Sequence, residues 1–345
     1  MSQPTSSYRG AGVNIDQANL AKKKIRSLAR RSFTGGVLTD MGGFGRLFRL
    51  HKNTFSQPVL VSSVDGVGTK LKVAFATGIH RSVGRDLVAH CVNDILVQGA
   101  APLLFMDYIA TGKMVPEVIA KIVGGISVEC RETGCALLGG ETAEMPGFYQ
   151  EGEYDLAGFI VGIVEKARII NGSEIRPGHV ILGLPSAGLH TNGYSLARKL
   201  LLEDFGYTVN TRLPQLRQTV GTVLLAPHLN YFQILKPLID RQLIQGMAHI
   251  TGGGLTENVP RILPPKCKAC IRLGSWPVLP IFSLLQTLGN VGEEEMLRTF
   301  NMGVGMVIIV SPRDVSKVER HFMQRQQAFY LIGEVRAGKS RVVYE

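Results

Sequence analysis

The sequence predicts a mixed α/β protein of the α+β class with two domains, on three observations. Runs typical of strands and of helices alternate in both halves of the chain. The chain has 345 residues, and one domain per ~150 residues gives about two domains. Polar residues and Arg176-Pro177-Gly178 interrupt the pattern between 165 and 178. We therefore expect an N-terminal domain over 1–170 and a C-terminal domain over 171–345.

Hydrophobic periodicity predicts the elements of the first half. Arg85–Gln98 repeats its apolar residues with a period near 3.6 and is expected to be a helix. Pro58–Ser63 is a short run with β-branched residues, typical of a strand. In chain order the expected elements are a helix at 16–31, a glycine turn at 42–45, a strand at 58–63, a helix at 85–98, a strand at 103–110, a helix at 115–133, and strands at 136–138 and 156–164.

The second half repeats this order of strands, loops and helices. Glycine-rich loops there follow apolar runs and precede amphipathic ones, as in strand–loop–helix units. The expected elements are a strand at 180–184, a glycine loop at 185–193, helices at 194–204 and 227–243, a glycine loop at 251–255, a helix at 255–262, a strand at 304–310, a helix at 313–326 and a strand at 328–335.

Composition excludes several classes of protein. Hydrophobic residues make up 45% and charged residues 19% of the chain, the reverse of a disordered composition. A membrane span is not expected, because no run of ~18 apolar residues occurs, and the N-terminus lacks the apolar region of a secretory signal. Five cysteines, an odd number, favour a reducing, cytoplasmic location. Cys267 and Cys270 have CxxC spacing but no second pair, which favours ordinary cysteines over a zinc site.

The net charge of +11 suggests an anionic partner, but the charge is uneven. Residues 1–59 carry +8, residues 60–165 carry −6 and residues 171–345 carry +7. A nucleic-acid-binding protein, which would show steeply salt-dependent duplex binding, leaves the acidic centre unexplained, and the chain has no pattern of such proteins. The basic run 22–31 is open to two interpretations, a solvated helix face or an arm that faces phosphate.

Several motifs could carry chemistry. Asp65-Gly66-Val67-Gly68-Thr69-Lys70 follows a strand, and its glycines would let backbone N–H groups approach a phosphate while Asp65 binds Mg²⁺. A plain tight turn is the alternative. The helix at 85–98 gathers oxygen and nitrogen ligands on one face, and capping with a solvated face is its alternative. These face residues are Asp86, His90, Asn93 and Asp94.

Three further segments complete the candidate set. Glu141 lies in the glycine-rich run 139–147, which could instead be a loop with solvated acids. The loop at 185–195 offers Ser186, Thr191 and Asn192 before a helix, where free N–H groups face anions. His249 precedes Gly252-Gly253-Gly254, although a lone histidine is more often structural. The patterns GxSxG, HExxH and GxGxxG are absent, so these residues favour ATP-dependent chemistry on a phosphorylated substrate.

With these motifs in place, the chain resembles the phosphoribosylformylglycinamidine cyclo-ligase (AIR synthetase) family, colinearly from about residue 8 to 335. The matching stretches are Tyr8…Ala11–Asp16, Gly42–Gly45, Asp65–Lys70, Cys91–Asp94, Gly139–Gly147, His190–Ser195, Thr251–Gly254 and Thr299–Met306. The resemblance implies N-terminal domains that pair across a homodimer to form a β-barrel, each followed by a C-terminal α+β sandwich domain. It implies no nucleic-acid or membrane partner.

The resemblance also implies a ligase reaction of purine biosynthesis. ATP phosphorylates the formamide oxygen of formylglycinamidine ribonucleotide (FGAM), and ring closure gives aminoimidazole ribonucleotide (AIR), ADP and phosphate. The implied cofactors are ATP and Mg²⁺, with K⁺ a further candidate. The implied roles are Mg²⁺ ligands and catalysis for Asp65 and Asp94, catalysis for His249 and Asn192, ATP or phosphate contacts for Gly66, Gly68, Thr69, Lys70, Arg26 and Glu141, and substrate contacts for Ser186, His190, Gly252, Gly253 and Gly254.

Two related ATP-using families are the alternatives. Selenophosphate synthetases normally carry a reactive cysteine or selenocysteine in an N-terminal glycine-rich segment, and this chain has no cysteine before Cys91. Thiamine-phosphate kinases lack the run at 139–147. The family often has lysine where this chain has Arg26, and because arginine is not a proton donor at neutral pH, only a phosphate contact is expected there.

Overall fold

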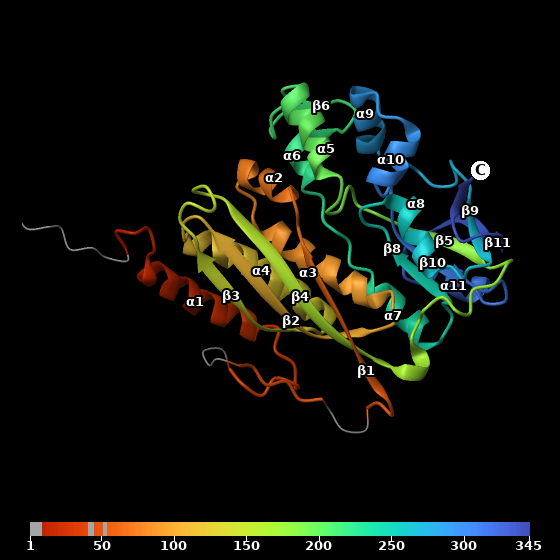
Figure 1. The fold of residues 1–345 in the computed structure, drawn as a ribbon, viewed down its shortest axis with the longest axis horizontal. Coiled ribbons are helices and arrows are strands. Elements are labelled where there is room, and N and C mark those ends of the chain that lie inside the picture. Colours follow the sequence, from red (N-terminus) through yellow and green to blue (C-terminus); the bar gives the residue numbers. More distant parts are fainter. Residues whose placement is uncertain (1–8, 41–44, 51–53) are drawn as a thin grey trace, which may run out of the picture.

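The structure, a computed structural model, describes residues 9–40, 45–50 and 54–345. The expected glycine turn at 42–45 therefore lies almost wholly outside the described residues. The described chain forms two halves, each built on its own β-sheet, which lie side by side in Figure 1. No helix among the described residues is long and apolar enough to cross a membrane.

The N-terminal half is a four-stranded sheet with helices against one face. Its order is β1-β4-β2-β3, and only the β2–β3 pair is parallel because α4 connects those two strands. Helices α3 and α4 cover the same face of the sheet (Figure 1). The elements are α1 Ile15–Arg30, β1 Pro58–Gly66, α2 Lys70–Thr77, α3 Arg81–Leu96, β2 Ala101–Thr111, α4 Pro116–Thr133, β3 Ala136–Glu144, β4 Tyr154–Glu165 and the 3₁₀ turn η1 Lys166–Arg168.

The C-terminal half is a six-stranded sheet in the order β12-β9-β11-β5-β10-β8, antiparallel except for β12 with β9. The prediction of an α+β fold is confirmed. The elements are β5 Val180–Pro185, α5 Tyr194–Arg198, the π-helical turn η2 Lys199–Asp204, β6 Arg212–Leu213, β7 Gln218–Thr219, α6 Val220–Leu224, α7 Phe232–Asp240, β8 Gly246–His249, α8 Gly254–Asn258, the 3₁₀ turn η3 Val259–Ile262, β9 Cys267–Ile271, α9 Pro280–Gly289, α10 Glu293–Thr299, β10 Val304–Val310, α11 Val315–Gln324, β11 Tyr330–Ala337 and β12 Val342–Tyr344.

Two glycines let α3 and α4 pack backbone against backbone. A Cβ on Gly84 would lie 2.1 Å from the carbonyl oxygen of Ile122, and one on Gly125 would lie 2.1 Å from that of Arg81. Any side chain at either position would push the helices apart. This contact leaves the opposite side of α3 free to face the C-terminal half.

The helix expected at 227–243 is shorter than predicted. It corresponds to α7, which runs from Phe232 to Asp240. The backbone before it is held by α3 instead of by a helical turn. The amide of His228 donates to Oδ1 of Asp86 at 2.8 Å, and that of Tyr231 donates to Oδ1 of Asn93 at 3.1 Å. Tertiary hydrogen bonds thus override the local periodicity. Several further elements were not predicted because they are short or lack a clear period: α2, β6, β7, α6, β8, β9, α9, α10 and β12.

Candidate active site

The candidate site lies where α3 and the end of β1 meet loops of the C-terminal half. Asp65 is the second-last residue of β1, and Asp94 is in the last turn of α3. His249 ends β8, and Thr191 lies in the loop between β5 and α5. Two carboxylates from one half therefore face polar side chains from the other.

A continuous chain of four hydrogen bonds and one ion-pair contact connects Asp65 to Asp94 across the two halves. Every link joins side-chain atoms at hydrogen-bond distance. The links are Asp65 Oδ2 to His90 Nε2 at 2.8 Å, His90 Nδ1 to Thr191 Oγ1 at 2.8 Å, Thr191 Oγ1 to His228 Nδ1 at 3.2 Å, His228 Nε2 to His249 Nε2 at 2.9 Å, and His249 Nδ1 to Asp94 Oδ1 at 2.8 Å.

These five links fix how many protons the chain holds. Three neutral imidazoles and one hydroxyl supply four donors, and ionised carboxylates supply none. Five links with one proton each therefore need one proton more than the neutral side chains provide. When all links are made and both aspartates are ionised, one histidine of the chain is an imidazolium.

The extra proton is best placed on His90. Burial lowers the pKa of His90, but Asp65 and Asp94 outweigh it, so the pKa is raised. Burial lowers the pKa of His249, and it lowers that of His228 well below the usual histidine value. The chain is therefore most stable with the charge beside Asp65.

The two carboxylates suit a hard cation. Asp65 and Asp94 lie 2.8 Å and 3.9 Å from the same ring nitrogen of His90, and their side chains are 41% and 25% exposed. His90, Asp94 and His249 also place ligand-type atoms within 4.8 Å of one another. The ring nitrogens that face the carboxylates are donors, however, which leaves oxygen atoms as the available ligands. Oxygen ligands of this kind fit Mg²⁺.

Lys70 is not positioned to contact phosphate, contrary to the sequence prediction. Its ammonium is fully buried and pairs with Asp86 at 2.7 Å. It also donates to the carbonyl oxygens of His190 at 3.0 Å and Ala226 at 2.7 Å. An ammonium has three protons, and all three are used. Lys70 therefore holds the two halves together.

The four polar residues on one face of α3 form two pairs with different roles, which the sequence pattern did not distinguish. Asp86 and Asn93 bind backbone of the segment 226–231, the amide of Asn93 donating to the carbonyl of Leu229 at 2.8 Å. His90 and Asp94 instead enter the hydrogen-bonded chain. Half of the expected ligand face thus serves as an interface between the halves.

His190 and Ser186 are buried and support the loop between β5 and α5. His190 is 0% exposed, has the left-handed φ of 61°, and stacks on His228 with ring centroids 4.3 Å apart. Ser186 donates to Oδ1 of Asn301 at 2.9 Å. A Cβ on Gly305 would lie 2.5 Å from the His190 ring, so only glycine fits beneath it. In this arrangement neither predicted substrate contact is open to a ligand.

The remaining predicted loop residues lie on segments that follow Asp65, Thr191 and His249 in the chain. A Cβ added to Gly252 would lie 3.4 Å from Oδ1 of Asn192, so these two predicted site residues are neighbours. Asn258 supports the glycine run by donating to the carbonyl of Gly254 at 2.8 Å. Thr69 is exposed, with its hydroxyl 3.2 Å from that of Ser195. Gly66 and Gly68 follow Asp65 in the first half, and Gly253 follows His249 in the second.

Glu141 and Arg26 lie away from this group within one chain. Glu141 is on β3, three strands from β1 in the sheet order, which corresponds to about 14 Å. Arg26 is exposed on α1, which packs on α4 at the side of the N-terminal half away from the C-terminal half (Figure 1). The structure does not bring either residue to Asp65.

Sequence reasoning missed His228 and Ser63. His228 joins Thr191 to His249, and Ser63 donates to Oδ2 of Asp94 at 3.0 Å. His228 lay inside a predicted helix, where a lone histidine carries no signal. Ser63 could have been found from strand alternation, since Ser63 and Asp65 lie on one side of β1.

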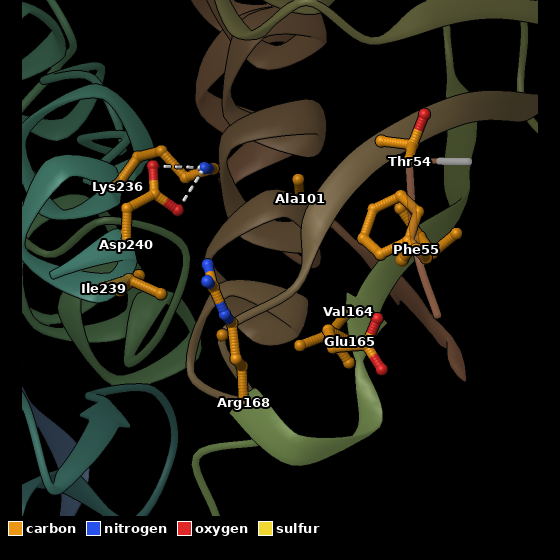
Figure 2. A pocket seen from close by; sticks show the side chains of 11 residues that line it. Thr54, Phe55, Ala101, Val164, Glu165, Arg168, Lys236, Ile239 and Asp240 are labelled. Atoms are coloured by element: carbon orange, nitrogen blue, oxygen red, sulfur yellow. Dashed lines mark hydrogen bonds and ion pairs between the residues drawn. The ribbon is translucent and has the colours of Figure 1, made fainter. Parts of the chain in front are cut away.

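A cavity at the other end of the junction between the halves does not contain this chemistry. It has a volume of about 240 Å³ and is lined by Phe55, Arg168 and Ile239 among others (Figure 2). It lies beside the Glu165 end of β4, which pairs with the start of β1, whereas Asp65 is seven residues further along that strand. At ~3.3 Å per residue this is about 20 Å away.

Known proteins match both halves. The model of the AIR synthase related protein N-terminal domain matches residues 53–164, and that of the C-terminal domain matches 176–345. A phosphoribosylformylglycinamidine cyclo-ligase of Trichlorobacter lovleyi is 52% identical over 337 residues, covering 98% of this chain and 97% of the relative. One of Brevibacillus brevis is 48% identical over 340 residues, covering 99% and 98%.

Solved structures share the fold at low identity. Thiamine-monophosphate kinase from Stenotrophomonas maltophilia superposes with a TM-score of 0.71 at 15% identity, covering 94% of this chain and 96% of that one. The hydrogenase maturation protein HypE in complex with ATP gives a TM-score of 0.64 at 16% identity, covering 92% and 88%. At this identity the likeness shows the two-sheet fold alone.

Proposed function

This chain belongs to the phosphoribosylformylglycinamidine cyclo-ligase family, and from that premise we propose that its carboxylate–histidine site converts FGAM and ATP to AIR, ADP and phosphate. Amide oxygen is a poor leaving group, so ATP first phosphorylates the formamide oxygen. The amidine nitrogen then attacks the activated carbon, the imidazole closes, and phosphate leaves. The observation that carries the proposal is the pair of part-exposed carboxylates that flank His90.

We propose that Asp65 and Asp94 hold Mg²⁺ with ATP. Bound there, the ion would neutralise charge on the transferred phosphoryl group. Asp94 is oriented for this by His249 and Ser63, which donate to its two oxygens. With one extra proton on the histidine chain, a shift of each shared proton along its bond would move that charge from His90 to His249. The site can therefore accommodate a change in charge without breaking its hydrogen bonds.

The direct test is an assay of FGAM-dependent ADP release with detection of AIR. We expect ADP, phosphate and AIR to form in equal amounts and only when FGAM and Mg²⁺ are both present. Release of phosphate from ATP without AIR would overturn the assignment. It would favour a different ATP-using activity of this fold. ADP formed without free phosphate, with the phosphoryl group transferred to thiamine phosphate, would instead identify a kinase.

A homodimer is the second part of the proposal. The sheet face opposite α3 and α4 carries apolar residues in register, with Val64 paired to Phe159 and Phe159 to Met106. Leu60 and Val64 are 60% and 59% exposed on the edge strand β1. A contiguous exposed apolar patch commonly marks a contact with another protein. A second copy would cover this face, and the barrel that the resemblance implies would follow.

We expect the protein to have the mass of two chains in sedimentation or light-scattering measurements. Val64→Glu should shift it to one chain, because a charge in the middle of an apolar interface is left unpaired. Leu331→Glu is the matched control, since Leu331 is 42% exposed on β11 in the other sheet. A single-chain mass for the unmodified protein, or equal dissociation by both variants, would contradict the proposed interface. A cytoplasmic location is part of the same proposal.

A further inference from the structure

A basic groove runs between α1 and α4, on the side of α4 away from the candidate active site. Its lining comes from one face of α1 with its C-cap residue Arg31, from one face of α4, and from Arg81 at the start of α3. The residues on α1 and α4 are spaced by three and four, as on a helix surface. The cavity has a volume of about 540 Å³, within the usual range for small-molecule sites. The lining residues are Lys24, Ser27, Leu28, Arg31, Arg81, Glu117, Ala120, Lys121, Gly124, Ser127, Val128 and Arg131.

Four cations around this groove have no partner for their side chains in the described part of the chain. Arg31, Arg81, Lys121 and Arg131 are all exposed and make no side-chain hydrogen bond or ion pair there. Burial lowers the pKa of His80, and the positive charge of Lys121 lowers it further. Four unpaired positive charges around one concavity repel one another, and an anion between them removes that repulsion.

One acid lies at the rim, and it is already paired. Glu117 lies 2.6 Å from the ammonium of Lys24. The groove therefore has a surplus of four positive charges. This surplus comes partly from the basic run 22–31, of which Lys24 and Arg31 face the groove, while Lys22, Lys23 and Arg26 are exposed outside its lining.

The floor of the groove is made of small residues. A Cβ on Gly124 would meet no atom within 4 Å, so the backbone of α4 is open to the cavity at that point. Ala120 and Ser127 stand one turn before and after it. A ligand can thus lie close to α4, between the cations of the two rims.

We propose that this groove is a second ligand site, which binds the phosphate chain of a polyphosphorylated small molecule. Arginine and lysine recognise phosphate oxygens by charge-assisted hydrogen bonds. Among the described residues, the lining contains no aromatic side chain on which a base could stack. Stacking platforms are the usual feature of single-strand binders. The groove therefore recognises the phosphates and not a base, and the ligand class is a polyphosphate or nucleoside polyphosphate.

The test is calorimetric titration of the full-length protein with inorganic tripolyphosphate in buffer without divalent cations. We expect one site per chain, with binding that weakens as salt rises. The double variant Arg31→Ala/Lys121→Ala should lower the affinity about tenfold or more, because two cations are lost. Glu117→Gln should raise the affinity, because Lys24 is released. AIR formation at saturating substrates should be unchanged in both variants.

Two controls separate the groove from general charge and from the active site. Lys22→Ala/Lys23→Ala removes the same number of positive charges from α1, outside the groove, and should leave the affinity unchanged. Asp94→Asn should also leave tripolyphosphate binding intact. Equal loss in the Lys22/Lys23 variant, loss of binding in Asp94→Asn, or no binding to the unmodified protein would overturn the proposal. Tighter binding of a single-stranded oligonucleotide than of tripolyphosphate would overturn it in favour of nucleic acid.

Discussion

Asp94→Asn is expected to lower the turnover of FGAM by at least about 100-fold, a loss typical of removing one electrostatic group from a reacting centre. Burial raises the pKa of Asp94, but the hydrogen bond from His249 and nearby charges outweigh it, so the pKa is lowered. The carboxylate is therefore ionised at neutral pH. The amide keeps the size and one acceptor oxygen but loses the charge that would hold Mg²⁺. Initial rates of AIR formation at saturating ATP and FGAM measure the effect.

The fold of this variant should be intact, because the Asn oxygen can still accept from His249. Its thermal midpoint should stay within a few degrees of the unmodified protein. Ser63→Ala is the matched control, since it removes one neutral hydrogen bond from the same carboxylate and should cost only about tenfold. Turnover of Asp94→Asn near the unmodified level would show that the metal does not depend on this residue.

Lys70→Met is expected to lower the free energy of unfolding by about 3–5 kcal/mol, the usual cost of breaking a buried ion pair from one side. The variant leaves the carboxylate of Asp86 at 0% exposure without its partner. The carbonyls of His190 and Ala226 also lose their donor. Denaturant unfolding measured by circular dichroism gives the value.

The loss should depend on pH in a defined direction. Burial raises the pKa of Asp86, and Lys70 lowers it, so removing the lysine raises the folded-state pKa further. A carboxyl group whose pKa is higher in the folded than in the unfolded state destabilises the fold once the pH rises above its unfolded pKa. The defect of Lys70→Met should therefore shrink as the pH falls toward the unfolded value of ~4.

The neighbouring Lys72 supplies the control. It lies in the same helix, is 46% exposed and pairs with Glu153, so Lys72→Met should cost at most about 1 kcal/mol. A phosphate-binding lysine would give the opposite pattern, a higher KM for ATP with unchanged stability. That outcome for Lys70 would disprove its role between the halves.

The sequence alone was sufficient for the fold class, the family and the reaction. Alternation of strand and helix patterns predicted an α+β chain, and the structure has one such sheet in each half. The resemblance identified the family to which the curated relatives belong. Those relatives are identical to this chain at about half of all positions. Both inferences depend on patterns local to each segment, and local patterns can be read without knowing which segments meet.

Only the tertiary structure decided which polar residues act together. Asp86 and Asp94 lie on one helix. Asp86 accepts a hydrogen bond from the backbone amide of His228, whereas Asp94 is hydrogen-bonded to the side chain of His249. Lys70 follows two glycines as a phosphate ligand would, yet it is buried because segments 120 and 156 residues away supply its acceptors. A side chain's function depends on its partner, and partners this far apart in the chain are brought together by packing of the two halves, which no local pattern encodes.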